Sequence, residues 1–156
     1  MFYGRPVDSL LAVRDTELSS SASMFVWPVR VYYEDTDAGG VVYYANYLKF
    51  LERARTEWLR SLGFEQDRLR EQEGIIFAVR SIQVEFHKPA RFNERLGVTV
   101  QPLRCKPASI LLAQSVLQGA AQRLLCRGTV KIACLNADSF IPRALPRRLV
   151  AEIPSD

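Results

Sequence analysis

The chain has 156 residues of which 48% are apolar, enough for one domain with a hydrophobic core. No apolar run approaches the roughly 18 residues of a membrane-spanning helix, which excludes membrane insertion. The formal charge of +4 suits a phosphorylated small molecule, an anionic lipid or nucleic acid. The basic residues are dispersed and no aromatic-basic RNA motif accompanies them, so nucleic acid ranks low.

Three cysteines, Cys105, Cys126 and Cys134, have no CxxC spacing, and an odd number does not make a disulfide framework. Cys126 and Cys134 sit among apolar neighbours and are expected in the core. This usage indicates a reducing, cytoplasmic compartment.

Residues 1–23 differ from the rest of the chain. A short apolar run at Leu10–Val13 is too short for a signal peptide core, and a serine-rich stretch follows it. We predict a disordered N-terminal extension over residues 1–23, with Met24 as a possible true start. The alternative is a docking segment. Residues 24–156 are expected to form a single domain.

The predicted elements begin with a strand and a helix. Apolar residues alternate from Phe25 to Tyr33, the period of a half-buried strand. From Asn46, a good N-cap residue, to Gly63, a good C′ residue, apolar residues recur at helical spacing over a wide face. Phe64–Glu73 is expected to form a short surface helix.

Four more strands are predicted downstream. A long one follows Gly74 and ends before Lys88-Pro89, because proline cannot donate to a sheet. The others cover Leu96–Val100, Ser109–Leu117 and Arg123–Leu135, and Pro146 begins a short helix through Val150. Short connections favour antiparallel neighbours. The fold class is therefore α+β, with one long helix held against a curved antiparallel sheet of about five strands.

An acidic, glycine-bearing turn joins the first strand to the helix. It contains Asp35, Asp37, Gly39 and Gly40. Acids at such a junction lie near free backbone N–H groups and the positive end of a helix, a suitable place for carbonyl chemistry. Aspartates in a turn also commonly bond their own backbone, and the residues alone favour that interpretation.

Other chemistries find little support. The only histidine, His87, has no GxSxG or cysteine signature beside it and is expected to be an ordinary strand-end residue. Metal ligands are too few and badly spaced, and no Walker loop or GxGxxG motif is present.

The stretch Asp35-Thr36-Asp37-Ala38-Gly39-Gly40-Val41-Val42-Tyr43, with Asn46-Tyr47 and Glu52-Arg53-Ala54-Arg55-Thr56-Glu57, resembles the signature of the 4-hydroxybenzoyl-CoA thioesterase family. These are hotdog-fold enzymes. The nearest branch is the bacterial acyl-CoA thioesterase encoded with the Tol-Pal envelope system. The resemblance runs from about Phe25 to Ile153.

The resemblance implies hydrolysis of an acyl-CoA thioester without metal or organic cofactor. Asp37 matches the catalytic acid, as general base or nucleophile, while Asp35 braces the turn. The backbone N–H of Tyr44 matches the donor to the carbonyl oxygen. The Tol-Pal branch often has histidine at Tyr44, and a tyrosine cannot shuttle protons near neutral pH. Gly39 and Gly40 let the backbone approach the substrate.

Coenzyme A phosphates need cationic side chains, and Lys88 and Arg91 are the best candidates. Further candidates are Arg104, Lys106, Arg127 and Lys131. Tyr44, Phe77 and Phe86 could line the acyl pocket, whereas Tyr43 and Tyr47 are expected in the core. The helix charges Glu52, Arg53, Arg55 and Glu57 are interpreted as structural residues, with an interface as their possible place.

The resemblance also implies a homodimer with one continuous sheet, or a homotetramer of such dimers, with phosphate ligands from the partner chain. An acyl carrier protein is a possible partner. Two rivals remain: an acyl-thioester dehydratase, which needs a histidine with an acid, and a non-catalytic protein that binds acyl-CoA or acyl carrier protein at the cell envelope.

Overall fold

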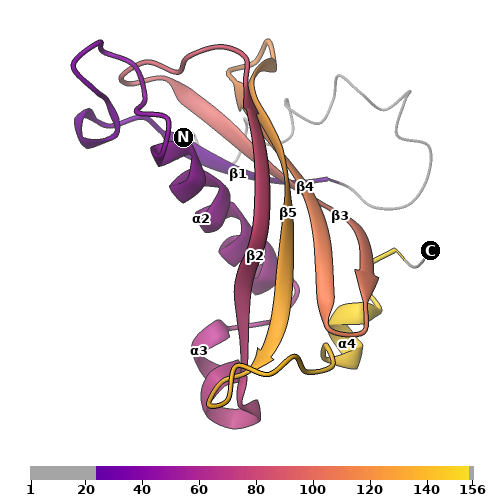
Figure 1. Cartoon of the computed structure of the whole chain (residues 1–156). Coiled ribbons are helices and arrows are strands. Elements are labelled where there is room, and N and C mark those ends of the chain that lie inside the picture. Colours follow the sequence, from indigo (N-terminus) through magenta and orange to yellow (C-terminus); the bar gives the residue numbers. More distant parts are fainter. Residues whose placement is uncertain (1–23, 155–156) are drawn as a thin grey trace.

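The computed structural model describes residues 24–154, so the extension predicted over residues 1–23 lies outside the described part of the chain. One antiparallel sheet curves around one long helix (Figure 1). The elements are β1 (Phe25–Arg30), η1 (Tyr33–Asp35), α2 (Asn46–Ser61), α3 (Gln66–Arg68), η2 (Leu69–Glu73), β2 (Ile75–Phe86), β3 (Arg95–Lys106), β4 (Ser109–Gln118), β5 (Arg123–Asn136) and α4 (Arg147–Val150). The predicted α+β class and the five strands are confirmed, but β1 ends at Arg30 rather than Tyr33, and β3 runs to Lys106, beyond the predicted end at Val100.

The strand order in the sheet is β1-β3-β4-β5-β2, with every pair antiparallel. β3, β4 and β5 form the expected meander. β2 does not continue it, because β2 pairs with β5 at the far edge rather than with β3. Residues 87–94 therefore cross from one side of the sheet to the other, and on the way they pass the acidic turn.

Helix α2 begins at Asn46, and its N-cap position is taken by Ala45, so the expectation that Asn46 caps the helix is wrong. Its C-terminal end is as predicted, since Gly63 has a left-handed φ of 89°. Seven residues of α2 are buried: Tyr47, Phe50, Leu51, Ala54, Arg55, Trp58 and Leu59. Each large apolar side chain among them contributes about 1.5–3 kcal/mol by leaving water. No helix within residues 24–154 is long and apolar enough to cross a membrane.

The helix covers only part of the sheet. It packs on β1, β3 and β4, whereas β2 leaves Val79, Ile82 and Phe86 exposed by 49%, 37% and 49%. Their cross-strand partners on β5 are buried, which places all three on the core side of β2. We call these three residues the uncovered strip. It lies on an edge strand whose outer side pairs with no other described strand.

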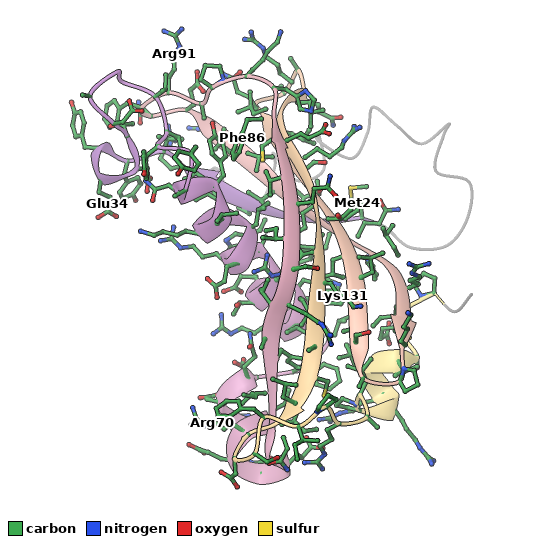
Figure 2. All side chains as sticks on the ribbon, in the orientation of Figure 1. Met24, Glu34, Arg70, Phe86, Arg91 and Lys131 are labelled. Atoms are coloured by element: carbon green, nitrogen blue, oxygen red, sulfur yellow. The ribbon has the colours of Figure 1, made fainter. Side chains whose placement is uncertain are left out.

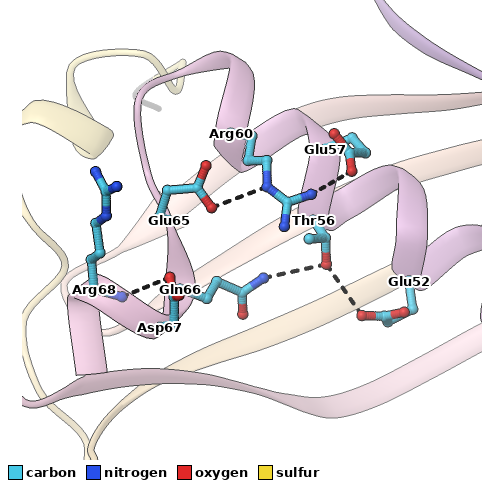
Figure 3. Close-up of polar contacts among 8 residues, drawn as sticks. All are labelled: Glu52, Thr56, Glu57, Arg60, Glu65, Gln66, Asp67 and Arg68. Carbon is cyan, nitrogen blue, oxygen red and sulfur yellow. Dashed lines mark hydrogen bonds and ion pairs between the residues drawn. The ribbon is translucent and has the colours of Figure 1, made fainter. Parts of the chain in front are cut away.

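Polar contacts join the C-terminal half of α2 to α3 (Figure 3). Arg60 lies between Glu57, at 2.5 Å, and Glu65, at 3.0 Å. Beside them, Gln66 Nε2 donates to Thr56 Oγ1 over 3.3 Å. In place of the single surface helix predicted over Phe64–Glu73, the chain forms two short helical segments, α3 and η2. These polar contacts and the burial of Phe64 and Leu69 hold the two segments against the rest of the fold.

One charged residue of α2 is buried against the sheet, in keeping with the structural role predicted for the helix charges. Arg55 is 8% exposed, and its Nη1 donates over 2.9 Å to Oε1 of the buried Gln114 on β4. Gln114 Nε2 in turn donates to the carbonyls of Leu51 and Thr99. Burial lowers the pKa of the Arg55 guanidinium. Arg55 therefore belongs to the helix–sheet interface, not to the solvated face.

Candidate active site

The acidic turn is closed by its own backbone. Asp37 N–H donates to Val41 O over 2.9 Å, and Gly40 N–H donates to Asp37 O over 3.0 Å. A bridge between Thr36 and Val42 closes the turn at its base. The loop is therefore a defined hairpin that projects Asp37 from the sheet edge just before α2.

The two aspartates, two residues apart, have different surroundings. Asp35 is 8% exposed in η1, and its Oδ2 accepts the Tyr32 N–H over 2.8 Å. The backbone carbonyl of Asp35 also accepts Tyr43 N–H and Asn46 Nδ2. Asp37 is exposed at the hairpin tip. Asp35 thus braces the turn, and Asp37 is the acid open to a substrate.

Asp37 uses one carboxylate oxygen and leaves the other open. Oδ1 accepts Gly39 N–H over 2.8 Å, which fixes the side chain. No partner for Oδ2 is recorded among residues 24–154. A Cβ at Gly39 would lie 3.1 Å from Asp37 Oδ1, and Gly40 has a φ of 78°. Gly39 therefore gives the carboxylate room, while Gly40 permits the left-handed turn.

Tyr44 presents an open backbone donor beside this carboxylate. The N–H groups of Tyr43 and Asn46 donate to Asp35 O and Tyr43 O, but no described hydrogen bond uses the N–H of Tyr44. It lies two residues before α2, at the positive end of the helix. Such an N–H can stabilise negative charge on a carbonyl oxygen.

Three tyrosines near the turn divide between core and surface. Tyr47 is 3% exposed, as predicted, and burial raises its pKa. Tyr43 is not in the core as expected: it is 47% exposed, and its pKa is raised by a hydrogen bond to Tyr44. The Tyr44 ring meets Phe86 edge to face, with centroids 6.2 Å apart. The end of β2 therefore lies beside the turn.

The residues that hold the crossing segment were not identified from the sequence. Tyr47 Oη accepts Ala90 N–H over 2.9 Å, and Ala90 O accepts Val42 N–H over 2.9 Å. One residue of the crossing segment, Ala90, is thus held by both the helix and the acidic turn. In the sequence, the Asn46-Tyr47 pair at the helix start predicts a helix cap and a core residue, and it does not indicate the bond to Ala90.

The candidate phosphate ligands lie on two separate surfaces. Arg91 forms a bridge with Val41, so it adjoins the acidic turn, and Lys88 follows β2 in the same crossing segment. Figure 2 shows Arg91 and Glu34 at the turn end of the molecule. A second basic group, Arg104, Lys106 and Lys131, surrounds a small hollow of about 50 Å³ where β3, β4 and β5 meet.

The histidine and the two core cysteines lie where the sequence predicts them. His87 follows β2, and its Nε2 lies 3.8 Å from Glu85. Cys126 and Cys134 are fully buried, and burial raises the pKa of Cys126 to about 11. No cluster of His, Cys, Asp or Glu within residues 24–154 could hold a metal ion.

A single long helix wrapped by a curved antiparallel sheet defines the hotdog fold. The chain belongs to the Thioesterase-like superfamily, whose model matches residues 31–156.

Curated relatives agree with this assignment. The acyl-CoA thioester hydrolase YbgC of Escherichia coli is 43% identical over 85% of this chain and 97% of its own length. Acyl-CoA thioesterase YbgC of Haemophilus influenzae is 42% identical over 81% of this chain and 92% of its own. The family and these relatives identify the chain as a thioesterase.

Solved structures share the fold. A structure from Bartonella henselae described as a probable thioesterase is 36% identical, with a TM-score of 0.74 over 79% of this chain and 99% of its own. A 1,4-dihydroxy-2-naphthoyl-CoA thioesterase from Synechocystis has a TM-score of 0.78 at 22% identity over 83% of this chain and 95% of its own, a likeness of fold.

Proposed function

We propose that this protein hydrolyses acyl-CoA thioesters with Asp37 as the reacting carboxylate and the Tyr44 N–H as donor to the carbonyl oxygen. The observation that carries the proposal is their pairing on one turn. Asp37 keeps one oxygen open, and Tyr44 keeps its N–H open, at the start of α2. Tyr44 acts through its backbone, so the absence of a histidine there does not matter.

The reaction needs no group beyond water. As general base, Asp37 takes a proton while the water oxygen bonds to the carbonyl carbon; the C–S bond then breaks and the proton passes to the coenzyme A sulfur. As nucleophile, Asp37 bonds to the carbonyl carbon and the C–S bond breaks, which releases coenzyme A as a thiolate. Water then cleaves the acyl anhydride to the free acid and the Asp37 carboxylate, and the proton from that water passes to the coenzyme A sulfur. Turnover in ¹⁸O-water distinguishes these routes, because only the anhydride route can leave ¹⁸O in the Asp37 side chain, which mass spectrometry of the protein detects.

The decisive assay measures free thiol release from short, long and aromatic acyl-CoAs. Asp37→Asn should lower kcat by about 10³-fold, a size typical of losing a positioned acid or base. Asp35→Asn is the matched control, since its amide oxygen can still accept the Tyr32 N–H; it should keep activity within about tenfold. Equal rates for wild type and Asp37→Asn, with coenzyme A binding retained, would favour the non-catalytic binding protein instead.

We further propose that Lys88 and Arg91 bind the coenzyme A phosphates, because the Arg91–Val41 bridge joins their segment to the catalytic turn. The Arg104, Lys106 and Lys131 group is the competing surface. Replacement of each set by glutamine, assayed with acyl-CoA and with acyl-3′-dephospho-CoA, separates them. Replacing the set that binds the phosphate should raise KM for acyl-CoA far more than it raises KM for the dephospho substrate.

The functional unit is proposed to be a homodimer formed through β2. Its support is the open edge of a twelve-residue strand and the uncovered strip of Val79, Ile82 and Phe86. Unpaired edges of this length favour pairing with another strand. Light scattering on wild type and on Ile82→Lys tests this: the lysine should shift the protein toward monomer. The predicted tetramer, carrier-protein partner, Tol-Pal association and cytoplasmic location remain predictions.

A further inference from the structure

The hydroxyl of Tyr47 connects helix α2 to the acidic hairpin through the crossing segment, residues 87–94. Tyr47 Oη accepts the Ala90 N–H over 2.9 Å. Ala90 O accepts the Val42 N–H over the same distance of 2.9 Å. Helix and hairpin are therefore joined through space by one residue of the crossing segment, in addition to their covalent link along the chain.

The hairpin receives this connection at its base. Val42 bridges to Thr36 across the hairpin, and its neighbour Val41 bridges to Arg91 of the crossing segment. The carbonyl of Val41 accepts the Asp37 N–H over 2.9 Å. Three hydrogen bonds therefore lead from the side chain on the helix to the backbone of the proposed reacting residue.

The connection is buried at each step. Tyr47, Ala90 and Val42 are exposed by 3%, 0% and 4%. Within residues 24–154, Tyr47 Oη is the acceptor recorded for the Ala90 N–H. A buried N–H that loses its acceptor has no water to replace it, so the backbone around it must move. The position of the middle of the crossing segment thus depends on a single oxygen atom.

The two ends of the crossing segment have anchors of their own. The Lys88 N–H donates to Leu125 O over 3.2 Å. Beyond Ala90, the Arg91 N–H donates to Glu94 Oε2 over 2.9 Å. Loss of the tyrosine hydroxyl would therefore loosen the middle of the segment, which holds the hairpin, more than the ends, which carry the proposed phosphate ligands.

Tyr47 also lies next to the proposed oxyanion donor. It is in the first turn of α2, and its N–H donates to the carbonyl of Tyr44 over 3.3 Å. We propose that Tyr47 is a positioning residue for thioester hydrolysis, whose hydroxyl holds the hairpin so that Asp37 stays aligned with the Tyr44 N–H. Tyr47 does this from the core, without contact to the substrate. The inference rests on the proposed function, which assigns the reaction to Asp37 and the Tyr44 N–H.

Tyr47→Phe is the direct test, because it removes the hydroxyl and keeps the ring. The ring packs on Phe50 and Phe86, with centroids 6.1 Å and 5.5 Å away. Since a shift of about 1 Å in a reacting group can cost about 100-fold, we expect kcat to fall by about 10–100-fold. KM for acyl-CoA should change by less than about threefold. An unchanged kcat, or a loss confined to KM, would overturn the proposal.

Ile110→Val is the matched control for a loss of stability alone. Ile110 is 2% exposed at the start of β4, beside the β3–β4 turn. Figure 1 places this turn near α4, at the far end of the sheet from the acidic hairpin. Both variants should lower the urea midpoint, but only Tyr47→Phe should lose kcat. An equal loss of kcat in Ile110→Val would make the effect merely structural and overturn the proposal.

A double variant tests whether Tyr47 acts through Asp37. In the Asp37→Asn background no carboxylate remains to be aligned, so adding Tyr47→Phe should lower the residual rate by less than about threefold. The same fold loss in both backgrounds would show that Tyr47 acts on something else, and the proposal would be wrong.

Amide hydrogen exchange of the wild type tests the connection without any variant. The Ala90 and Val42 N–H groups should exchange as slowly as the strand amides of β5, because they are buried and hydrogen-bonded. Exchange at Ala90 as fast as in exposed turns would overturn the proposal.

The positioning role and the proposed function fail in different ways. If Asp37→Asn loses activity while Tyr47→Phe does not, the positioning role is wrong and the proposed function stands. If Asp37→Asn is as active as the wild type, the proposed function fails and the positioning role fails with it.

Discussion

The buried Arg55–Gln114 pair allows a sharp test of how helix and sheet are joined. The perturbation is Gln114→Met, which preserves length and apolar packing but removes the acceptor of Arg55 Nη1. A hydrogen bond to a charged group contributes about 1.5–3 kcal/mol. Loss of the two Gln114 donations to backbone carbonyls adds about 1 kcal/mol. We expect the free energy of unfolding to fall by about 2.5–4 kcal/mol.

The reverse change separates the pair from its parts. Arg55→Met leaves Gln114 Oε1 without its donor but removes the buried charge, so its cost should be about 1–2 kcal/mol. The double variant should be more stable than Gln114→Met alone, because no uncompensated guanidinium remains. The double-mutant cycle should therefore give a coupling energy of about 2 kcal/mol.

Urea unfolding at one fixed protein concentration measures these values, since an oligomer's stability depends on concentration. Two results would show that Arg55 finds water or another acceptor: the losses in unfolding free energy of the two single variants add up to that of the double variant, or Gln114→Met costs less than about 1 kcal/mol. The inferred role of the pair in the helix–sheet interface would then be wrong.

Three further outcomes follow from single positions. Burial raises the pKa of Cys126 from 9.0 to about 11, so its contribution to stability is complete below pH 9 and is lost as pH rises to about 11. That contribution is about 2–3 kcal/mol, and Cys126→Ala should flatten the pH dependence of urea midpoints in this window. Gly39→Ala should lower kcat by about 10–100-fold with an unchanged urea midpoint, because its Cβ would press on Asp37 Oδ1. Gly128→Ala should cost about 1–3 kcal/mol, measured in the same way, because its Cβ would lie 2.6 Å from Gln83 O in the β2–β5 ladder.

The sequence predicted elements where the local period was strong. Alternation located β2, β4 and β5 to within a residue or two, and the glycine after α2 marked its end. The pairing of the strands was harder to predict from the sequence. The strand beside β2 is β5, and this choice depends on contacts between residues about 50 positions apart. The same limit hid Arg55: its helix position looked amphipathic, but only the position of β4 decides that Gln114 meets it.

Which tyrosines near the turn are buried also depends on tertiary contacts and could not be predicted from the sequence alone. Tyr43 and Tyr47 are both aromatic and lie four residues apart, yet only Tyr47 is in the core. The difference arises because α2 begins between them, at Asn46, so that Tyr47 lies on the buried helix face while Tyr43 belongs to the hairpin. The hollow of about 800 Å³ at the start of β2 could not be predicted from any one segment of the sequence, because residues of α3, η2, β2 and the loop after β5 line it together.

The different surroundings of Asp35 and Asp37 explain why one short motif can hold two acids. A carboxylate that fixes a loop must be buried and hydrogen-bonded, as Asp35 is by the Tyr32 N–H. A carboxylate that is to react, the role proposed for Asp37, must keep an oxygen free, as Asp37 does while the Gly39 N–H binds the other. Because the Asp35 carbonyl also binds Tyr43 N–H and the Asn46 amide, the bracing acid fixes the backbone on both sides of Tyr44. In the proposed mechanism, Asp35 therefore sets the position of the Tyr44 N–H, the donor that acts together with Asp37.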